Sequence, residues 1–139
     1  MWFSKKEADK APKGQVTTKA VGDAAELIAL AHLRRAGLKL VESNYRTPGR
    51  GGGEIDLIMQ DADGTLVFIE VRQRASQSHG GAGASISAVK QRRIVFAARH
   101  YLIRFKTQPP CRFDVVLING GLGAGDTQAV EWLRCAFDA

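Results

Sequence analysis

The sequence is poor in the residues that most often build zinc sites and covalent nucleophiles. It has two cysteines and three histidines. Cys111 and Cys135 lack the spacing of a zinc site and are interpreted as reduced thiols. His32, His79 and His100 are scattered along the chain without ligand spacing. We therefore expect neither zinc chemistry nor histidine catalysis.

Long apolar runs are also absent. No stretch approaches the roughly 18 apolar residues of a membrane-spanning helix, and the first residues lack the apolar core of a signal peptide. We therefore expect a soluble, cytoplasmic protein with no membrane partner. The length of 139 residues and the hydrophobic content of 45% suit one compact domain. Residues 1–19, which are rich in lysine, are expected to form a flexible basic arm, and residues 20–139 the domain itself.

Nucleotide-binding loops are not indicated either. Residues 120–125 (GGLGAG) follow a predicted strand as a dinucleotide-binding loop would, but little chain remains after them and no helix start is marked. The sequence has no phosphate-loop lysine. We interpret residues 120–125 as an ordinary loop.

What the sequence does contain is a pair of acidic residues inside apolar strands. Residues 53–58 (GEIDLI) and 68–74 (FIEVRQR) are separated by DADGT, which has the composition of a tight hairpin turn. A three-residue loop with Gly64 in the left-handed conformation pairs Asp61 with the residue after Gly64. This register places Asp56 opposite Glu70 on the neighbouring antiparallel strand.

Directly opposed carboxylates repel each other unless positive charge lies between them. In this register the Cβ atoms of Asp56 and Glu70 would be about 5 Å apart. A divalent cation would relieve the repulsion, because Mg²⁺ is commonly held by one or two carboxylates with waters and a substrate phosphate, and the carbonyl of Val71 could add an oxygen. The alternative is a rim hairpin whose acids face water.

A third carboxylate lies on the first predicted helix. Residues 21–37 carry an apolar stripe that includes Leu27, Leu30 and Leu33, and Glu26 falls on that stripe. A buried carboxylate needs a cationic partner. We therefore expect Glu26 to contact a metal, its bound water or an arginine such as Arg72. The alternative is a buried ion pair that only fixes the helix.

The predicted elements follow an αβββαβ order. They are a helix at 20–37, strands at 39–46, 53–60 and 65–74, a helix at 85–105, a strand at 112–119, and a short strand with a helical tail from about 128. The strand at 112–119 is apolar on both faces, which is typical of a central strand covered by helices on each side. The connection through the second helix has the length of a right-handed parallel crossover. We therefore expect an α/β fold with a mixed central sheet flanked by helices, and we interpret Asp114 beside Arg112 as structural.

Positive charge is concentrated in one part of the sequence. The net charge is +6, and residues 71–113 contain no aspartate or glutamate. Their basic residues, which suit a partner such as DNA or RNA, are Arg72, Arg74, Lys90, Arg92, Arg93, Arg99, Arg104, Lys106 and Arg112. The alternative is a solvated helix face. Tyr45, Arg46 and the glycine-rich residues 50–53 could add contacts at the mouth of a cleft, and a flexible loop at 77–84 could close over a bound duplex.

Together these motifs resemble the YraN family, also called uncharacterised protein family 0102, whose members resemble PD-(D/E)XK nucleases of the Holliday-junction resolvase type. The resemblance covers most of the chain. The matching segments are 22–29, 44–46, 53–58, 68–71, Lys90 with 93–94, and 112–116. The resemblance implies a restriction-endonuclease-like αβββαβ core in a single nuclease-like domain at 20–139. It also implies that Asp56 and Glu70 are metal ligands, that Glu26 assists them, and that the substrate is nucleic acid.

One position departs from the family pattern in a way that concerns the chemistry. Where the family has a lysine two residues after the strand glutamate, this sequence has Arg72. A guanidinium, with a pKa above about 12, cannot act as a base. Arg72 can instead stabilise charge on a phosphate, while a metal-bound hydroxide or Lys90 from the next helix activates the nucleophile.

The leading hypothesis is a Mg²⁺- or Mn²⁺-dependent endonuclease that hydrolyses phosphodiester bonds in DNA, with branched DNA as the expected substrate. Its catalytic residues would be Glu26, Asp56, Glu70, Arg72 and Lys90. Its metal ligands would be Asp56, Glu70, Val71 and Glu26. Its nucleic-acid contacts would be Tyr45, Arg46, Arg74, Arg92 and Arg93.

Two alternatives remain open. One is a catalytically degenerate nuclease-fold module that binds nucleic acid or scaffolds a repair complex. The other is a protein-only adaptor. A homodimer is expected by analogy with junction resolvases.

Overall fold

The structure is a computed structural model that describes residues 18–74, 86–121, 125 and 127–139. Most of the predicted basic arm at 1–19 and all of the predicted loop at 77–84 lie outside these residues. The elements are α2 (Thr18–Arg35), β1 (Lys39–Arg46), β2 (Glu54–Gln60), β3 (Leu66–Arg74), α3 (Ala88–Leu102), β4 (Cys111–Asn119) and β5 (Ala129–Phe137). Among the described helices, none is long and apolar enough to cross a membrane.

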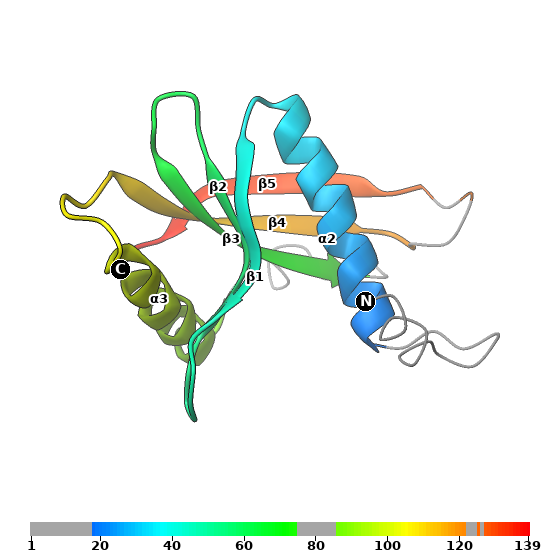
Figure 1. The fold of residues 1–139 in the computed structure, drawn as a ribbon. Coiled ribbons are helices and arrows are strands. Elements are labelled where there is room, and N and C mark those ends of the chain that lie inside the picture. Colours follow the sequence, from blue (N-terminus) through cyan, green and yellow to red (C-terminus); the bar gives the residue numbers. More distant parts are fainter. Residues whose placement is uncertain (1–17, 75–85, 122–124, 126) are drawn as a thin grey trace, which may run out of the picture.

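The strands form one mixed sheet in the order β1-β2-β3-β4-β5. Strands β3 and β4 are parallel and are connected through α3, whereas the other neighbours are antiparallel. The sheet is strongly twisted, so that β1 runs steeply across the direction of β4 and β5 (Figure 1). The predicted α/β fold with a mixed central sheet is therefore confirmed, and it is consistent with a restriction-endonuclease-like core.

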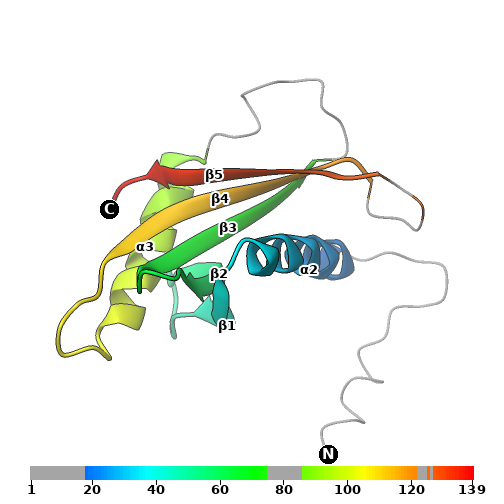
Figure 2. The ribbon, with the colours of Figure 1, turned by 90° about the horizontal axis from the view of Figure 1, so that it is seen from above.

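The two helices pack on opposite faces of the sheet and form two separate cores. Ala25, Ala29 and Leu33 of α2 pack with residues such as Val67 and Ile69, whose side chains point to one face of β3. The core on the other face contains from α3 Ile94, Ala97, Ala98 and Tyr101, and from the sheet Phe68, Phe113 and Val115 among others. Seen from above, α2 and α3 lie at different ends of the long strands (Figure 2). The small residues of α2 allow that helix to approach the sheet closely.

The predicted hairpin register is confirmed. Gly64 has a φ of 92°, the left-handed conformation that glycine adopts without strain, and the Asp61 N–H donates to the Thr65 carbonyl over 2.9 Å. The ladder between β2 and β3 then pairs Gln60 with Leu66 and, further along, Leu57 with Ile69. The turn therefore fixes which residues of the two strands face each other.

The short strand predicted from about residue 128 is confirmed, but the helical tail that was expected to follow it is wrong. The chain instead continues as β5 through Phe137 and pairs antiparallel with β4, with a register shift between Phe113 and Val115. The Trp132 indole N–H and the Cys135 backbone N–H both donate to the carboxylate of Asp114, which holds β5 against the sheet. The strand is favoured because it supplies these donors to a buried acid on β4.

Candidate functional site

Asp56 lies where strands β2 and β3 separate. Beyond the Leu57–Ile69 pair, β2 stays paired with β1 as far as Glu54, whereas β3 stays paired with β4. In the opening, the Asp56 Oδ2 atom accepts the backbone N–H of Val71 over 2.8 Å. The carboxylate thus takes a donor that a continuous antiparallel ladder would bond to a carbonyl. Divergence of the strands places a charged side chain inside the sheet.

Glu70 lies next to Asp56 and is 9% exposed. Its Oε2 atom is 3.6 Å from the Lys90 Nζ atom on α3. Its Oε1 atom has no hydrogen-bond partner among the residues that the structure describes. A buried carboxylate oxygen without a partner is costly, so this atom is suited to a ligand that the protein alone does not supply.

The two carboxyls share hydrogen bonding, and both pKa values are raised. Burial, followed by the charge of Asp56, raises the pKa of Glu70 from 4.5 to about 8, against the opposing charge of Lys90. Burial also raises the pKa of Asp56, while the Val71 N–H and a hydrogen bond with Glu70 lower it. Burial and mutual repulsion therefore favour protonation of this pair, and a cation bound there would relieve the same repulsion.

Glu26 reaches Asp56 from α2, on the other face of the sheet. Burial, followed by the charge of Asp56, raises the Glu26 pKa from 4.5 to about 7, and hydrogen bonding to Asn44 lowers it. Asn44 has a φ of 54°, which is uncommon outside glycine. Glu26 lines a cavity of about 220 Å³ with Asn44 and Ser43. Asn44 lies in a segment that matches the family pattern, but its role beside Glu26 was not predicted, because that role depends on a helix packed across it.

Arg72 and Lys90 line a cleft beside Glu70. The cleft has a volume of about 390 Å³ and is also lined by Ile86 and Ser87. The Ser87 side chain accepts the backbone N–H of Lys90 over 3.1 Å and caps the start of α3. This cap fixes the first turn of the helix, from which Lys90 extends to Glu70.

Gly53, from the glycine-rich segment expected at the mouth of a cleft, packs closely against α3. A Cβ atom on Gly53 would lie 1.9 Å from the carbonyl oxygen of Arg93, so only glycine fits against the helix backbone here. The Gly53 N–H donates to the Thr47 hydroxyl over 2.7 Å, and the Arg93 Nη2 atom lies 3.3 Å from the carbonyl oxygen of Gly52. The run of three glycines was the signal for this close approach.

The donor set suits a hard divalent cation that keeps some of its waters. Asp56 and Glu70 offer carboxylate oxygens, and the carbonyl of Val71 is on the same strand segment. In the described part of the chain, no group of three or more histidine, cysteine, aspartate or glutamate side chains is arranged to hold one metal ion. Mg²⁺ fits such a set, because it is usually bound by one or two carboxylates with waters and substrate phosphates. Glu26 contacts Asp56 but lines a different cavity from Glu70.

The predicted nucleic-acid contacts do not all lie on the surface. Tyr45 is buried, with its hydroxyl hydrogen-bonded to His100, so its ring faces the core. Arg74 donates to the Asn119 side chain over 2.9 Å at the end of β3. Arg46 is exposed, and its Nη2 atom lies 3.8 Å from the Oε2 atom of Glu54.

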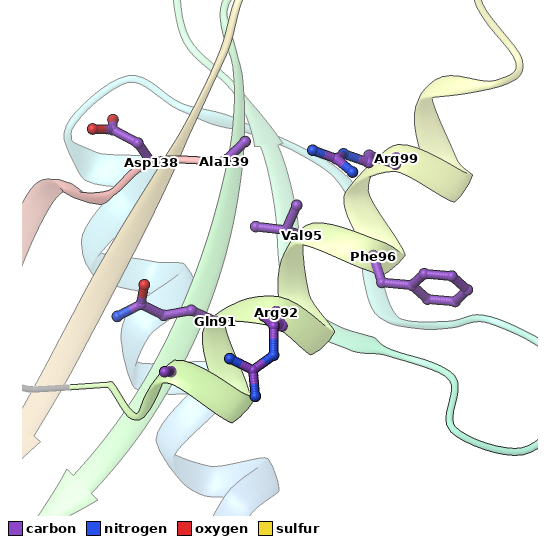
Figure 3. A pocket seen from close by; sticks show the side chains of 8 residues that line it. Gln91, Arg92, Val95, Phe96, Arg99, Asp138 and Ala139 are labelled. Atoms are coloured by element: carbon purple, nitrogen blue, oxygen red, sulfur yellow. The ribbon is translucent and has the colours of Figure 1, made fainter.

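Arg92 and Arg93 are exposed on α3. Arg92 lines a separate groove of about 500 Å³ along this helix (Figure 3). Of the predicted contact set, these two arginines and Arg46 therefore present their side chains to solvent.

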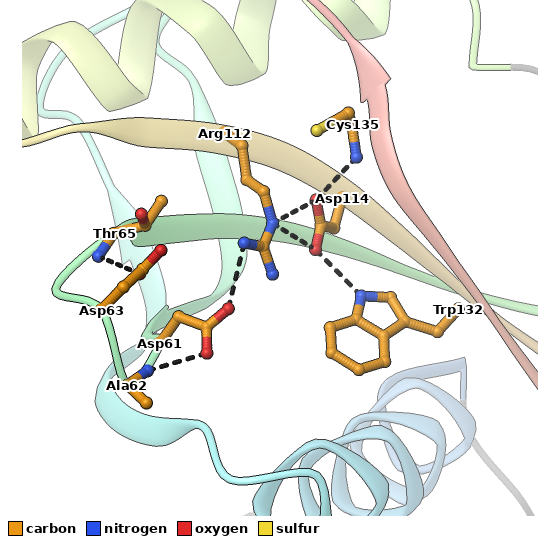
Figure 4. Close-up of polar contacts among 8 residues, drawn as sticks. All are labelled: Asp61, Ala62, Asp63, Thr65, Arg112, Asp114, Trp132 and Cys135. Atoms are coloured by element: carbon orange, nitrogen blue, oxygen red, sulfur yellow. Dashed lines mark hydrogen bonds and ion pairs between the residues drawn. The ribbon is translucent and has the colours of Figure 1, made fainter.

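Asp114 belongs to a separate structural network, as predicted. It is fully buried, and Arg112 lies between it and Asp61, with Nε 3.1 Å from Asp114 Oδ2 and Nη1 3.1 Å from Asp61 Oδ2 (Figure 4). The Trp132 indole N–H donates to the Asp114 Oδ2 atom over 2.9 Å. These contacts join the hairpin turn, β4 and β5.

Comparison with known proteins gives matches over nearly the whole chain. The model of the uncharacterised protein family UPF0102 matches residues 25–118. A UPF0102 protein of Polaromonas naphthalenivorans (strain CJ2) is 65% identical over 152 residues, covering 100% of this chain and 99% of the relative. A UPF0102 protein of Polaromonas sp. (strain JS666) is 64% identical over 148 residues, with the same coverage of 100% and 99%. A UPF0102 protein of Cupriavidus pinatubonensis is 54% identical over 127 residues, covering 91% of this chain and 92% of the relative.

Proposed function

The chain belongs to the uncharacterised protein family UPF0102, as its sequence motifs predicted, and we propose that it is a divalent-metal-dependent endonuclease acting on DNA. One observation carries the proposal. Asp56 and Glu70 meet where β2 and β3 separate, and Glu70 lies beside the cationic side chain of Lys90. Paired carboxylates next to cations in an open cleft suit phosphate chemistry assisted by a metal.

Asp56, Glu70 and the carbonyl of Val71 are the groups that would hold the metal. When bound, a divalent cation supplies Lewis-acid stabilisation of the phosphate and a water of lowered pKa. Asp56 is oriented for this task by the Val71 N–H, which fixes one of its oxygens. Glu26 interacts with Asp56 from α2, and it would help to position the Asp56 carboxylate.

Lys90 and Arg72 supply positive charge on the cleft wall. Both line the same cleft as Glu70. Their side chains would neutralise charge that develops on the scissile phosphate. Arg72 cannot serve as the base, because a guanidinium stays protonated. The arginine therefore acts by electrostatic stabilisation, and Lys90 completes the cationic wall from α3.

The exposed arginines would hold the rest of the polymer. Arg46, Arg92 and Arg93 lie outside the cleft and face solvent. Such side chains bind phosphates with little regard to base sequence. We propose branched DNA as the substrate class because of the resemblance to junction resolvases, and Mg²⁺ or Mn²⁺ as the cofactor.

The test is cleavage of junction, flap and linear duplex DNA by the purified protein in Mg²⁺ or Mn²⁺. We expect cleavage by the parent protein and its loss in Asp56→Asn. The matched control is Asp63→Asn, which changes an exposed acid on the hairpin turn. Failure of the parent to cleave any substrate in either metal would refute the proposal, as would equal cleavage by Asp56→Asn.

A second candidate is a nucleic-acid-binding module without catalysis, which could scaffold a repair complex. Arg72 favours it, because the residue stands where the family pattern has lysine. This candidate predicts salt-dependent binding of DNA with no cleavage in any metal. Absence of both binding and cleavage would instead favour a protein-only adaptor.

A further inference from the structure

The outward face of α3 combines exposed arginines with an exposed aromatic ring. Arg92, Phe96 and Arg99 follow a spacing of four and then three residues, which places their Cα atoms on one side of the helix. Phe96 is 53% exposed, although a phenylalanine side chain is usually buried. Figure 3 shows its ring extending from α3 on the side opposite to the Gln91 and Arg99 side chains. The proposed metal site does not use this face.

The surroundings of Phe96 combine apolar side chains with two arginines. Arg92 and Arg99 line a groove of about 500 Å³ along α3, together with the apolar side chain of Val95. The sequence of α3 contains no aspartate or glutamate. Asp138 lines the same groove, but Figure 3 shows it on the side away from Phe96. The two arginines outnumber this one acidic side chain in the groove, so charge complementarity favours a polyanionic partner along α3.

An exposed ring, on a helix that carries a cation before it and a cation after it in the sequence, distinguishes single-stranded from duplex nucleic acid. The bases of a duplex are stacked on each other, so a duplex would use only the arginines. An unpaired base has a free face, and stacking it on an aromatic side chain contributes about 1–3 kcal/mol. Arg92 and Arg99 are about 10 Å apart along the helix axis, so they can meet different phosphates on the two sides of one base.

We infer that this face of α3 binds a single-stranded segment of nucleic acid, with Phe96 stacked on an unpaired base and with Arg92 and Arg99 on the flanking phosphates. The inference rests on the proposed function for the class of polymer, but it needs neither metal nor cleavage. It narrows the substrate to DNA that carries an unpaired segment, such as a flap, a gap or an open junction.

The test measures binding without catalysis. Fluorescence anisotropy in EDTA would compare a labelled oligothymidylate with a blunt duplex of equal length. We expect Phe96→Ala to weaken oligothymidylate binding about tenfold and duplex binding about twofold or less. Phe96→Tyr should restore the oligothymidylate affinity because it keeps an aromatic ring. Val41→Ala is the matched control, since Val41 is an exposed apolar residue on β1.

The arginines are tested by salt dependence. Arg92→Ala and Arg99→Ala should each weaken binding of both polymers and reduce the salt slope by about one. Arg34→Ala and Arg35→Ala, which change exposed arginines on α2, are the matched controls and should leave the slope unchanged.

Three results would overturn the inference. The first is an unchanged oligothymidylate affinity in Phe96→Ala, and the second is an equal loss for the two polymers. The third is a parent protein that sediments as a dimer and a Phe96→Ala variant that sediments as a monomer with unchanged DNA binding. That result would assign this face of α3 to contact with a second copy of the chain. Cleavage of DNA by Phe96→Ala with normal single-strand binding would leave the proposed function intact and remove only this inference.

Discussion

The Asp56 carboxylate accepts the backbone N–H of Val71 over 2.8 Å, at the point where β2 and β3 separate. Asp56 therefore has a structural role as well as a chemical one. Its oxygen satisfies a strand donor that has lost its ladder partner. The same hydrogen bond fixes the carboxylate beside Glu70, so sheet geometry and site geometry depend on one interaction.

Substitutions of Asp56 should separate these two roles. Asp56→Asn keeps an oxygen acceptor for Val71, whereas Asp56→Ala leaves the N–H without its side-chain partner at a cost of about 1–3 kcal/mol. Urea unfolding in EDTA should therefore show Asp56→Asn to be at least as stable as the parent and Asp56→Ala to be less stable. Both variants should lose cleavage. Equal stability of the two variants would show that the hydrogen bond to Val71 contributes nothing.

The stability of the metal-free protein should fall as pH rises from mildly acidic to alkaline values. Burial and the charge of Asp56 raise the pKa of Glu70 from 4.5 to about 8, and the same two causes raise that of Glu26 to about 7. The folded protein therefore binds more protons than the unfolded chain in this window. The contribution to stability is fully present below the unfolded pKa and is lost as pH rises through the folded values.

Glu70→Gln tests this dependence. Urea unfolding in EDTA would be measured at a pH of about 5, 6.5 and 8.5. The free energy of unfolding of Glu70→Gln should fall less steeply with pH than that of the parent, by at most about 1.4 kcal/mol per pH unit. Glu131→Gln, which changes an exposed glutamate on β5, is the control and should keep the parent slope. A slope unchanged by Glu70→Gln would mean that this carboxyl is ionised in the folded protein at neutral pH.

Addition of Mg²⁺ or Mn²⁺ should raise the melting temperature more at alkaline than at acidic pH. A cation competes with protons for Asp56 and Glu70, so binding is favoured once the pair is deprotonated. A metal concentration of about 100 times the dissociation constant would add about 2.7 kcal/mol of stability. Differential scanning fluorimetry should show this increase in the parent and its loss in Glu70→Gln. An equal increase in the variant would place the metal elsewhere.

The sequence predicted the hairpin and its register because local chemistry determines them. Gly64 adopts the left-handed conformation at the turn, and once the turn is fixed, the pairing of Leu57 with Ile69 follows by counting. Strand β1 was predicted with the same bounds as observed, since a glycine and a proline-glycine segment flank it. The approach of Asp56 to Glu70 depends on this local information.

Features that depend on distant contacts were not predicted. A short strand was predicted from about residue 128, but β5 continues through Phe137 in place of the predicted helical tail, because Trp132 and Cys135 supply hydrogen bonds to Asp114, which is distant in sequence. Tyr45 was assigned to a surface contact, although its ring packs in the core against Tyr101. In each case tertiary packing decides the outcome, and no periodicity in the local sequence reports it.

Gly53→Ala should destabilise the protein and disturb the cleft. The added methyl would overlap the Arg93 carbonyl, so α3 would have to move away from β2 at a cost of about 2 kcal/mol or more. Lys90 would move with the helix away from Glu70. Urea unfolding and cleavage assays should both show the loss.

Gly22→Ala is the matched control for that glycine. Gly22 lies inside α2, and no atom lies within 4 Å of the position that an added methyl group would take. A helix interior favours alanine over glycine, so this variant should gain about 0.5–1 kcal/mol. A Gly53→Ala protein as stable as the parent would show that the glycine run does not set the position of α3.

Arg72→Lys tests the meaning of the arginine in the cleft. If Arg72 stabilises the phosphate through the several donors of its guanidinium, lysine keeps the charge but loses the paired geometry, and we expect cleavage to fall about tenfold. Arg72→Ala should reduce cleavage further because it also removes the charge. Single-turnover cleavage of the preferred substrate, with Arg35→Lys on the surface of α2 as the control, measures these effects. A gain of cleavage in Arg72→Lys would contradict this role and would mean that the arginine had weakened an ancestral lysine-dependent site.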